Sequence, residues 1–474
     1  MKLLIVEDDE TSIAFFAEEL ARPPVVQPVF AKSRDSAIAT LKGQTFDLVI
    51  LDLKIPTTDG SLDAEPTHGL AVHAAVLDDA KGTPVVIFSG FGTLKLLTDL
   101  LEKSEKHDVC GTGVQRTMTL FREKSDMAEC LTQIRNFAVE IAALGQIEIS
   151  FGTDLIDLSY EQKKVLRIFA RRNGGRNVHV TKLGGGLSAA LTCRIVIQDD
   201  NRVPVCYAAV KLGNIRDLEH EYHGYQLHVA PRIRLGGFAH VIDFIKAGAA
   251  GIGGLFYGLA KEHDSSLLDE MRLSPATTDQ IINQLRALET RWQTGAPASD
   301  RTVAEIRRDM IEDSEFQPHV GMLPFDWQRL EQTNVRVSRC SQHRDLHGLN
   351  VLLKNRGEPL LIDFGAVGPA PACIDPLILE LSLLFHPACR DVCGAWPTVD
   401  QTKKWDDLDV FTGGCPFPAY IRACRKWAFE IEAGDKAVFA TAYAFSVRQL
   451  KFDGINHELA IAVAEAANRR IMAD

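Results

Sequence analysis

The chain lacks several features that mark membrane and secreted proteins. None of its 474 residues belongs to an apolar run of about 20 residues, the length that a transmembrane helix needs. The best candidate, Ala247 to Ala260, is short and rich in glycine. The amino terminus runs from a few apolar residues directly into acidic ones, which is not the pattern of a signal peptide. We therefore expect a cytoplasmic protein with no membrane partner.

Cysteine pairs with the usual metal-binding spacing are also lacking. The ten cysteines include no C-x-x-C pair and form no disulfide framework, which favours a reducing compartment. One group, made of His386, Cys389, Cys393 and Cys415, could be drawn as a zinc site. Cys389 and Cys393 lie four residues apart in a predicted helix, however, so we favour small buried thiols without a metal.

Clusters of basic residues are missing as well. The net charge is −11, no stripe of Lys and Arg stands out, and no helix-turn-helix signal is present. These absences argue against a nucleic-acid partner and against a DNA-binding regulator. The composition, 46% hydrophobic and 24% charged, is that of a globular chain with room for two or three domains.

The first 140 residues alternate between strand and helix signals. Helical patterns separate five short apolar runs, which are Leu3–Val6, Val25–Phe30, Asp47–Leu51, Val85–Phe88 and Met118–Phe121. This alternation predicts a doubly wound α/β domain with a parallel sheet. Such sheets bind their ligands at the carboxyl ends of the strands.

Reactive side chains follow four of these runs. Glu7 and Asp8 come after the first, Asp52 after the third, Ser89 after the fourth and Lys124 after the fifth. Three carboxylates attract Mg²⁺, and a hydroxyl and a lysine suit the oxygens of a phosphoryl group on the central carboxylate. The alternative is an acidic rim that binds nothing.

The ordered pieces Val-Glu-Asp-Asp, Leu-Asp-Leu-Lys-Ile-Pro, Phe-Ser-Gly and Phe-Arg-Glu-Lys resemble a response-regulator receiver domain with a flavodoxin-like fold. The resemblance implies that Asp52 is the phosphoacceptor, that a sensor histidine kinase is the phosphodonor, and that Phe121 reports the switch. Two departures touch the signalling face. The polar insert Thr57–His68 displaces a familiar glycine to Gly69, and the interval from Ser89 to Lys124 is long.

A second motif runs from His343 to Gly365. Asp345 is followed five residues later by Asn350, and a predicted hairpin leads to Asp363 in an Ile-Asp-Phe-Gly turn. Asn350 and Asp363 offer the hard oxygen ligands that Mg²⁺ prefers, and Asp345 could accept the proton of a hydroxyl group. The hairpin predicts that both metal ligands lie at one end of it.

The motif His-x-Asp-Leu-His-x-x-Asn-Val-Leu with Ile-Asp-Phe-Gly resembles the catalytic core of the protein-kinase-like superfamily. His347 is typical of its aminoglycoside- and choline-phosphotransferase branch. The resemblance implies an α+β fold of two lobes, Mg²⁺ and ATP as cofactors, and transfer of a phosphoryl group to an unknown hydroxyl acceptor. It also places Asp375 where this superfamily anchors the catalytic loop.

Residues upstream of this motif complete the expected nucleotide site. Gly184, Gly185, Gly186 and Ser188 form a turn between predicted strands whose amides could approach phosphate oxygens, although the run departs from G-x-G-x-x-G. Lys211 ends a predicted strand, Val-Cys-Tyr-Ala-Ala-Val-Lys, where such enzymes carry their phosphate-binding lysine. We predict Glu221 as its acidic partner, with Glu219 as the second choice.

The predicted organisation is a receiver at 1–140, a linker at 141–158, a small kinase-like lobe at 159–263 and a large lobe at 264–474. A helix from Ser159 to Arg172 is either a connector between domains or a part of the small lobe. The motifs also resemble the kinase-like ternary-complex-associated domains. The alternative to an active enzyme is an inactive pseudokinase that serves as a nucleotide-sensing or partner-binding scaffold. We also consider that the chain forms a homodimer.

Overall fold

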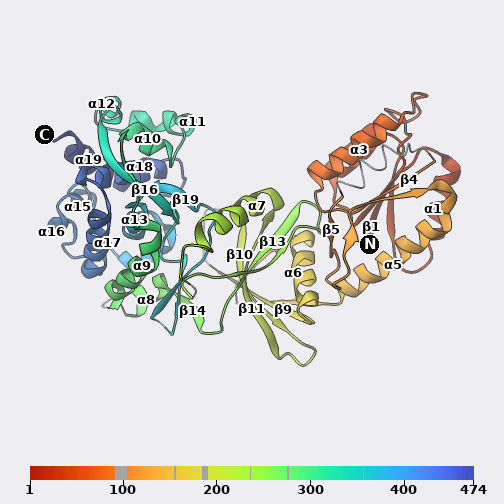
Figure 1. The fold of residues 1–474 in the computed structure, drawn as a ribbon, viewed down its shortest axis with the longest axis horizontal. Helices are drawn as coiled ribbons and strands as arrows, with labels where there is room; N and C mark the ends of the chain where they lie inside the picture. The colour runs from red at the N-terminus through yellow and green to blue at the C-terminus, as the bar shows by residue number, and fades with distance from the viewer. Residues whose placement is uncertain are drawn as a thin grey trace. The chain divides into compact units, whose positions relative to one another are not determined.

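The structure is a computed structural model that describes residues 1–90, 104–153, 156–183, 190–234, 236–274, 277–355 and 357–473 (Figure 1). The chain forms two compact units. The first contains Met1–Glu219 and Val241–Leu259, and the second contains His220–His240 and Ala260–Asp474. Among the helices described, none is both long enough and apolar enough to cross a bilayer.

The first unit begins with a five-stranded parallel sheet. Its strands are β1 (Lys2–Val6), β2 (Gln27–Ala31), β3 (Leu48–Leu51), β4 (Val85–Ser89) and β7 (Thr119–Glu123). They pair in the order β2-β1-β3-β4-β7, all in parallel. This is the flavodoxin-like strand order, so the doubly wound sheet predicted for this region is confirmed.

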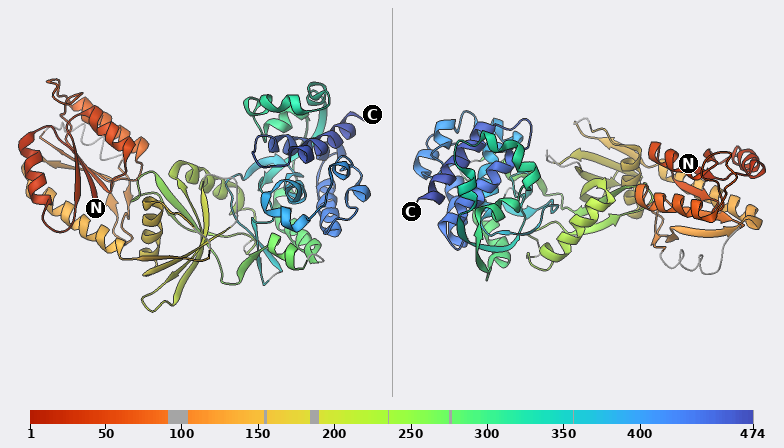
Figure 2. Two further views of the ribbon diagram at one scale, coloured as in Figure 1. Left: turned by 180° about the vertical axis from the view of Figure 1, so that it is seen from behind. Right: turned by 90° about the horizontal axis from the view of Figure 1, so that it is seen from above.

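Helices cover both faces of this sheet (Figures 1 and 2). Because successive strand residues point to opposite faces, each strand feeds two separate cores. Leu3 and Ile5, together with the residues of neighbouring strands that point to the same face, pack under α1 (Glu10–Leu20) and α5 (Met127–Gly145). Leu4 and Val6, together with the residues of neighbouring strands that point to the opposite face, pack under α2 (Arg34–Gly43) and α3 (Pro66–Asp79).

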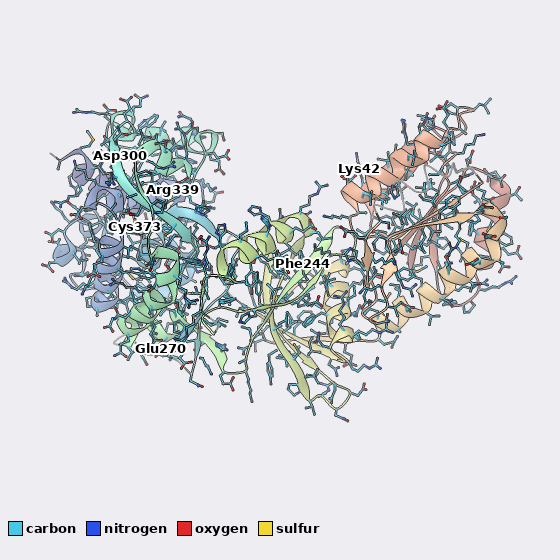
Figure 3. The ribbon with its side chains drawn as sticks, in the orientation of Figure 1. Lys42, Phe244, Glu270, Asp300, Arg339 and Cys373 are labelled. Atoms are coloured by element: carbon cyan, nitrogen blue, oxygen red, sulfur yellow. The ribbon has the colours of Figure 1, made fainter. Side chains whose placement is uncertain are left out.

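A six-stranded sheet completes the first unit. Its strands are β8 (Glu148–Phe151), β9 (Asn177–Lys182), β10 (Leu191–Gln198), β11 (Pro204–Asn214), β12 (Val241–Ile245) and β13 (Ile252–Gly258). The order is β12-β13-β11-β10-β9-β8. All pairs are antiparallel except β8 with β9. Phe244, labelled in Figure 3, lies on the edge strand β12.

The strand β8 corrects the prediction of a linker at 141–158. Residues 141–145 end helix α5, and 148–151 pair in parallel with β9. The sequence misled us because β8 is a short edge strand with one half-buried apolar residue, Ile149, between polar neighbours. An edge strand of this composition looks like a loop until its partner is known.

Two helices cover opposite faces of the six-stranded sheet. Gly253 and Gly254 are consecutive on β13, so added side chains would point to opposite faces. A Cβ on Gly254 would lie 2.6 Å from Val165 of α6 (Tyr160–Arg172). A Cβ on Gly253 would lie 3.0 Å from Ile215 of α7 (Ile215–Gly224). Helix α6 begins at a capping box formed by Ser159 and Gln162, as the Ser159 start predicted.

The second unit is mainly helical and holds two small sheets. One sheet has the order β14-β17-β18 and the other β15-β16-β19. Their strands are β14 (His263–Ser266), β15 (Ala298–Thr302), β16 (Asn334–Gln342), β17 (Val351–Lys354), β18 (Glu358–Leu361) and β19 (Gly368–Pro371). Figure 3 labels Asp300 on β15, Arg339 on β16 and Cys373 just before α13 (Ile374–Phe385).

Helix α13 forms the centre of this unit, because all twelve of its residues are buried. The surrounding helices are α8 (Leu267–Leu273), α9 (Thr278–Gln293), α10 (Val303–Arg308), α11 (Asp313–Phe316), α12 (Trp327–Glu331), α14 (Arg390–Cys393), α15 (Val399–Thr402), α16 (Leu408–Phe411), α17 (Pro418–Ile431), α18 (Asp435–Gln449) and α19 (His457–Met472). A π-helix, Tyr225–Val229, continues α7. The predicted α+β fold, with a sheet-rich lobe and a helical lobe, is confirmed.

Candidate functional site

The structure brings the acidic residues of the five-stranded sheet together. Oxygen atoms of Glu7, Asp8 and Asp52 lie within 4.8 Å of one another, as the ligands of one cation would. Glu7 and Asp52 are buried, and Asp8 is exposed. The set fits Mg²⁺, which prefers carboxylate oxygens and retains several waters. Sequence reasoning grouped these three residues because parallel strands end at one edge of a sheet.

Asp52 is held through both of its carboxylate oxygens. Ser89 donates its hydroxyl hydrogen to Oδ1 at 2.6 Å, and Lys124 Nζ lies 2.6 Å from Oδ2. Lys124 also lies 2.8 Å from Glu7. The hydroxyl and the ammonium group are therefore positioned to bind the oxygens of a group attached to Asp52. Phe121 lies half-buried on β7, against the core under α2 and α3.

Burial changes the proton affinities in this cluster. Loss of water raises the pKa of Glu7 and of Asp8, and the negative charge of Asp52 acts in the same direction. Burial alone would lower the pKa of Lys124, but its bonds to Asp52 and Glu7 outweigh this effect and raise it. Lys124 is therefore a fixed cation at neutral pH, whereas Glu7 and Asp8 hold protons more readily than ordinary carboxyl groups.

Gly69 occupies the start of α3 for a steric reason. A Cβ at this position would lie 2.4 Å from the Cα of Leu53 and 2.7 Å from the carbonyl oxygen of Asp52. Its amide also donates to the carbonyl oxygen of Leu53 at 3.1 Å. The helix α3 thus packs directly against the backbone that follows Asp52, despite the polar insert at 57–68.

The second candidate site is built on the hairpin β17–β18. The strands pair antiparallel with Val351 opposite Leu361, and the Ile362 amide donates to the carbonyl oxygen of Asn350 at 3.1 Å. Asn350 and Asp363 therefore lie at the same end of the hairpin, as the motif predicted. Asp363 has φ = +64°. A non-glycine residue in the left-handed region is uncommon and is enriched at functional sites.

A buried carboxylate fixes the loop that carries Asp345. Asp375, at the start of α13, accepts the amide of His343 at 2.6 Å and the amide of Arg344 at 2.8 Å. Arg344 adopts φ = +65°, which these bonds support. Burial raises the pKa of Asp375 to about 7, although both amides favour its charged form. Asp375 thus has the anchoring geometry that the resemblance implied.

The Asp345 loop is also bonded to the strand that precedes Asp363. His343 is fully buried, and its Nε2–H donates to the carbonyl oxygen of Ile362 at 2.9 Å. Burial lowers the pKa of this imidazole, so it is neutral. The single bond links the loop bearing Asp345 to the residue immediately before Asp363.

Asn350 has a fixed orientation. Its Nδ2 donates to the carbonyl oxygen of Asp345 at 2.8 Å and lies 3.2 Å from His347 Nε2. These contacts engage the amide nitrogen and leave Oδ1 as the atom that could bind a cation. The Asp345 side chain is 42% exposed, so a substrate could reach it.

His386 lies beside this site, next to His347. Its ring centroid lies 4.7 Å from that of His347, and burial lowers the pKa of both imidazoles to about 4. Cys389, Cys393 and Cys415 are free thiols whose pKa values burial raises. Among the described residues, only Glu7, Asp8 and Asp52 gather as a set of three cation ligands.

The remaining predicted residues are placed in part. Lys211 is buried on β11, opposite Thr192 and Leu255 on the neighbouring strands. Glu221 is buried on α7, whereas Glu219 is paired with Lys81 at 2.7 Å and with Lys246 at 3.5 Å. Gly184, Gly185, Gly186 and Ser188 lie outside the residues that the structure describes.

Sequence reasoning missed a junction between the two sheets of the first unit. Lys164 of α6 lies 2.5 Å from Asp47, which precedes β3, and both side chains are at least 95% buried. Arg172 donates to the carbonyl oxygen of Asp108, in the long interval before β7. The loop 246–251 contributes Ala247 and Ala250 to the two cores of the parallel sheet. The Ala-Gly composition of this loop was the only sequence signal for the junction.

Comparison with known proteins gives structural neighbours only. No family model matches the sequence, and no curated protein is significantly similar to it. The Francisella response regulator 1452 receiver domain is 14% identical, with 30% of this chain and 98% of that chain covered and a TM-score of 0.23. The phosphorylated cyanobacterial phytochrome response regulator RcpA is 21% identical, with 28% and 89% covered and a TM-score of 0.21.

A further neighbour covers a larger share of the chain. It is a thermostable mutant of aminoglycoside phosphotransferase APH(4)-Ia, in ternary complex with ADP and hygromycin B. The identity is 10%, the alignment covers 62% of this chain and 95% of that chain, and the TM-score is 0.34. The structural neighbours of this chain thus include receiver domains and an aminoglycoside phosphotransferase.

Proposed function

We propose that this chain is a cytoplasmic response regulator whose receiver, residues 1–140, is phosphorylated on Asp52 by a sensor histidine kinase. The observation that supports the proposal is the environment of Asp52. Its two oxygens are bonded to Ser89 and Lys124, and Glu7 and Asp8 offer oxygens for Mg²⁺ beside it. In phosphotransfer, the carboxylate oxygen attacks the phosphorus of phosphohistidine, the phosphorus–nitrogen bond breaks, and the histidine leaves.

We further propose that residues 159–474 form a kinase-like phosphotransferase that uses Mg·ATP. Asn350 and Asp363 would hold Mg²⁺, and Lys211, kept in place by Glu221, would bind the phosphates. The proposal rests chiefly on the fixed geometry of the Asp345 loop, which Asp375 and His343 bond from two sides.

Asp345 has the position of a general base in this proposal. Its exposed carboxylate would accept the proton of the acceptor hydroxyl while the hydroxyl oxygen attacks the γ-phosphorus of ATP. The bond from the γ-phosphorus to the bridging oxygen breaks, and ADP leaves. Mg²⁺, when bound, would neutralise charge on the phosphate oxygens. Asn350 would orient Asp345 through its bond to the carbonyl oxygen of that residue.

The first experiment separates binding from transfer. Asp363→Asn should abolish Mg²⁺-dependent ATP binding in calorimetry, because the variant loses a charged metal ligand. Asp345→Ala should lower kcat for ATP turnover strongly and leave ATP affinity within about threefold, because its role is confined to the transition state. Equal ATP binding by the wild type and Asp363→Asn would contradict the assignment. A chain that binds ATP without turnover would be a pseudokinase scaffold.

The second experiment tests the receiver. Acetyl phosphate with Mg²⁺ should add one phosphoryl group to the full-length chain, as measured by intact mass, and Asp52→Ala should prevent this. Ser89→Ala is a matched variant that keeps the nucleophile and removes one contact to its oxygen, so we expect slower labelling of the same residue. Labelling of Asp52→Ala would place the phosphoacceptor elsewhere.

A further inference from the structure

Helix α7 is bonded to the receiver at its amino-terminal half. Lys81 Nζ donates to Glu219 at 2.7 Å, and Arg216 donates to the carbonyl oxygen and to Oδ1 of Asp78 at 3.3 Å. Asp78 lies in the last turn of α3, and Lys81 follows that helix. The receiver helix α3 therefore ends on the helix that also carries Glu221.

The backbone around these ion pairs is closely packed. The amide of Gly248 donates to the carbonyl oxygen of Gly82 at 2.8 Å. Gly82 has φ = +95°, and a Cβ there would lie 2.7 Å from the carbonyl oxygen of Lys246. Lys246 in turn lies 3.5 Å from Glu219. The loop 246–251 is in turn bonded to α7, because the amide of Ile215 donates to the carbonyl oxygen of Gly251 at 3.0 Å. A shift of the end of α3 can therefore reach the base of α7 through backbone contacts with this loop, as well as through the ion pairs.

The other end of α3 packs behind Asp52. Gly69 in its first turn donates to the carbonyl oxygen of Leu53, and it has no room for a side chain against Leu53 and Asp52. Phosphorylation of Asp52 would add charge and volume beside this backbone. A single helix thus contacts the backbone of Asp52 and Leu53 at its start and α7 at its end.

The carboxyl-terminal half of α7 belongs to the second unit. There the Tyr225 ring, in the π-helix that continues α7, lies 5.8 Å from the ring of Phe364. A Cβ on Gly224 would lie 3.0 Å from the Val367 side chain. Glu221 is near enough to His343 to raise the pKa of that imidazole, although burial lowers it overall. The helix therefore continues to the residues that flank Asp363 and Asp345.

We propose that Lys81 and Arg216 are positioning residues of the kinase-like site, and that α3 uses them to transmit phosphorylation of Asp52 to α7. This inference rests on the proposed function and names how that function is regulated. Glu219 and Glu221 are two residues apart, so they point to opposite sides of α7. Glu219 is bonded to the receiver, and Glu221 is buried and directed away from it. Movement of α7 therefore moves Glu221.

The experiment uses the full-length chain with and without beryllofluoride, which mimics the phosphoryl group on Asp52. Hydrogen–deuterium exchange is followed in the peptide that spans residues 215–229, together with kcat and KM for ATP turnover. In the wild type we expect beryllofluoride to change exchange in this peptide and to change kcat by at least about fivefold, the lower range of allosteric coupling. No change in exchange at residues 215–229, with beryllofluoride shown to be bound, would overturn the inference.

Variants test the named contacts. Lys81→Ala with Arg216→Ala should reduce the effect of beryllofluoride on kcat to about twofold or less and should abolish its effect on α7 exchange. Exposed ion pairs contribute little to overall stability, so we expect this double variant to remain folded. Lys81→Arg keeps the charge and should retain most of the response. Lys451→Ala is the matched control, because Lys451 is paired with Glu315 at 3.0 Å with similar exposure, away from α7.

Hydrogen exchange and ATP turnover together distinguish failure of the proposed function from failure of this inference. If the wild type turned over no ATP, the proposed phosphotransferase would fail, but α7 exchange would still test the inference. ATP turnover could instead respond to beryllofluoride equally in the wild type and in the double variant. That result would support the proposed enzyme activity and contradict the proposed coupling from α3 to α7.

Discussion

Asp375 shows how much of the Asp345 loop depends on one carboxylate. It is fully buried and accepts two backbone amides, one of which belongs to the left-handed residue Arg344. Glu289 is also fully buried, and burial with the charge of Asp375 raises its pKa well above the ordinary range. Glu289 therefore binds a proton more readily than an ordinary glutamate does, and the two amide bonds to Asp375 hold the loop.

We predict that Asp375→Ala lowers the free energy of unfolding by about 2–5 kcal/mol, because it leaves two buried N–H groups without an acceptor. Denaturant unfolding followed by circular dichroism measures this loss. Asp375→Asn keeps one good acceptor and should cost less. A loss below about 1 kcal/mol would mean that other groups or water replace the carboxylate.

The acidic cluster of the receiver predicts a pH dependence. Burial raises the pKa of Glu7 and Asp8, and a cation binds only their deprotonated forms. Mg²⁺ affinity at this site should therefore fall as the pH decreases from about 7 to about 5, starting at a higher pH than for ordinary carboxyl groups. Calorimetry on the Asp363→Asn variant would isolate this site. An affinity that is constant over this range would contradict the raised pKa values.

The sequence predicted which residues lie together within a motif and missed pairs that form across the fold. The common position of Asn350 and Asp363 at one end of the hairpin was predictable because the hairpin joins them. Asp47 and Lys164 are 117 residues apart, and each is an ordinary surface residue type, so neither indicates a partner. Their pairing follows only from the way α6 packs beside the parallel sheet.

At the scale of elements, helix α6 settles an alternative that the sequence left open. It was expected as a connector between domains or as a helix of the small lobe. It is part of the small lobe, because Val165, Leu166 and Phe169 lie in the core of the six-stranded sheet. It also contacts the receiver through Lys164, which is buried against Asp47. One helix thus contacts both sheets, through its apolar residues on one side and through Lys164 on the other.

We predict that Lys164→Met destabilises the first unit by about 3–5 kcal/mol, because it leaves the Asp47 carboxylate buried without a cation. Thermal unfolding of the full-length chain measures this effect. Asp47→Asn combined with Lys164→Met removes both charges and should recover much of the stability. Lys163→Met, on the next residue of the same helix, is the control. Equal stability of the two lysine variants would show that water reaches Asp47.

At the scale of the whole chain, the compact units do not follow the predicted domain borders. The first unit joins the receiver to the six-stranded sheet, and the second begins inside α7. The sequence predicted both folds, since strand periodicity and motif order are local signals. It could not predict this grouping, because the Ala-Gly loop 246–251 and Asp108 show their role only when they meet the receiver and α6.

We predict that a fragment of residues 159–474 is less stable than the full chain. Removal of the receiver would leave Lys164 without Asp47 and would expose Ala247 and Ala250. Its melting temperature in differential scanning calorimetry should lie several degrees below that of the corresponding transition in the full chain. The matched fragment 146–474 keeps β8 and should be the more stable of the two. A fragment 159–474 that melts with the full chain would show that the junction adds no stability.

The loop 246–251 limits which receiver domains could replace the one in this chain. Ala247 and Ala250 lie in the two cores of the parallel sheet, and the close backbone contacts at Gly82 and Gly248 leave no space for larger side chains. A gene fusion that exchanged this receiver for another would need a carboxylate at the position of Asp47. It would also need a surface that leaves the same space for the loop 246–251. Recombination between unrelated receivers would rarely supply both. A chimera that carries an unrelated receiver should therefore be less stable than this chain, unless further substitutions at the junction restore both contacts.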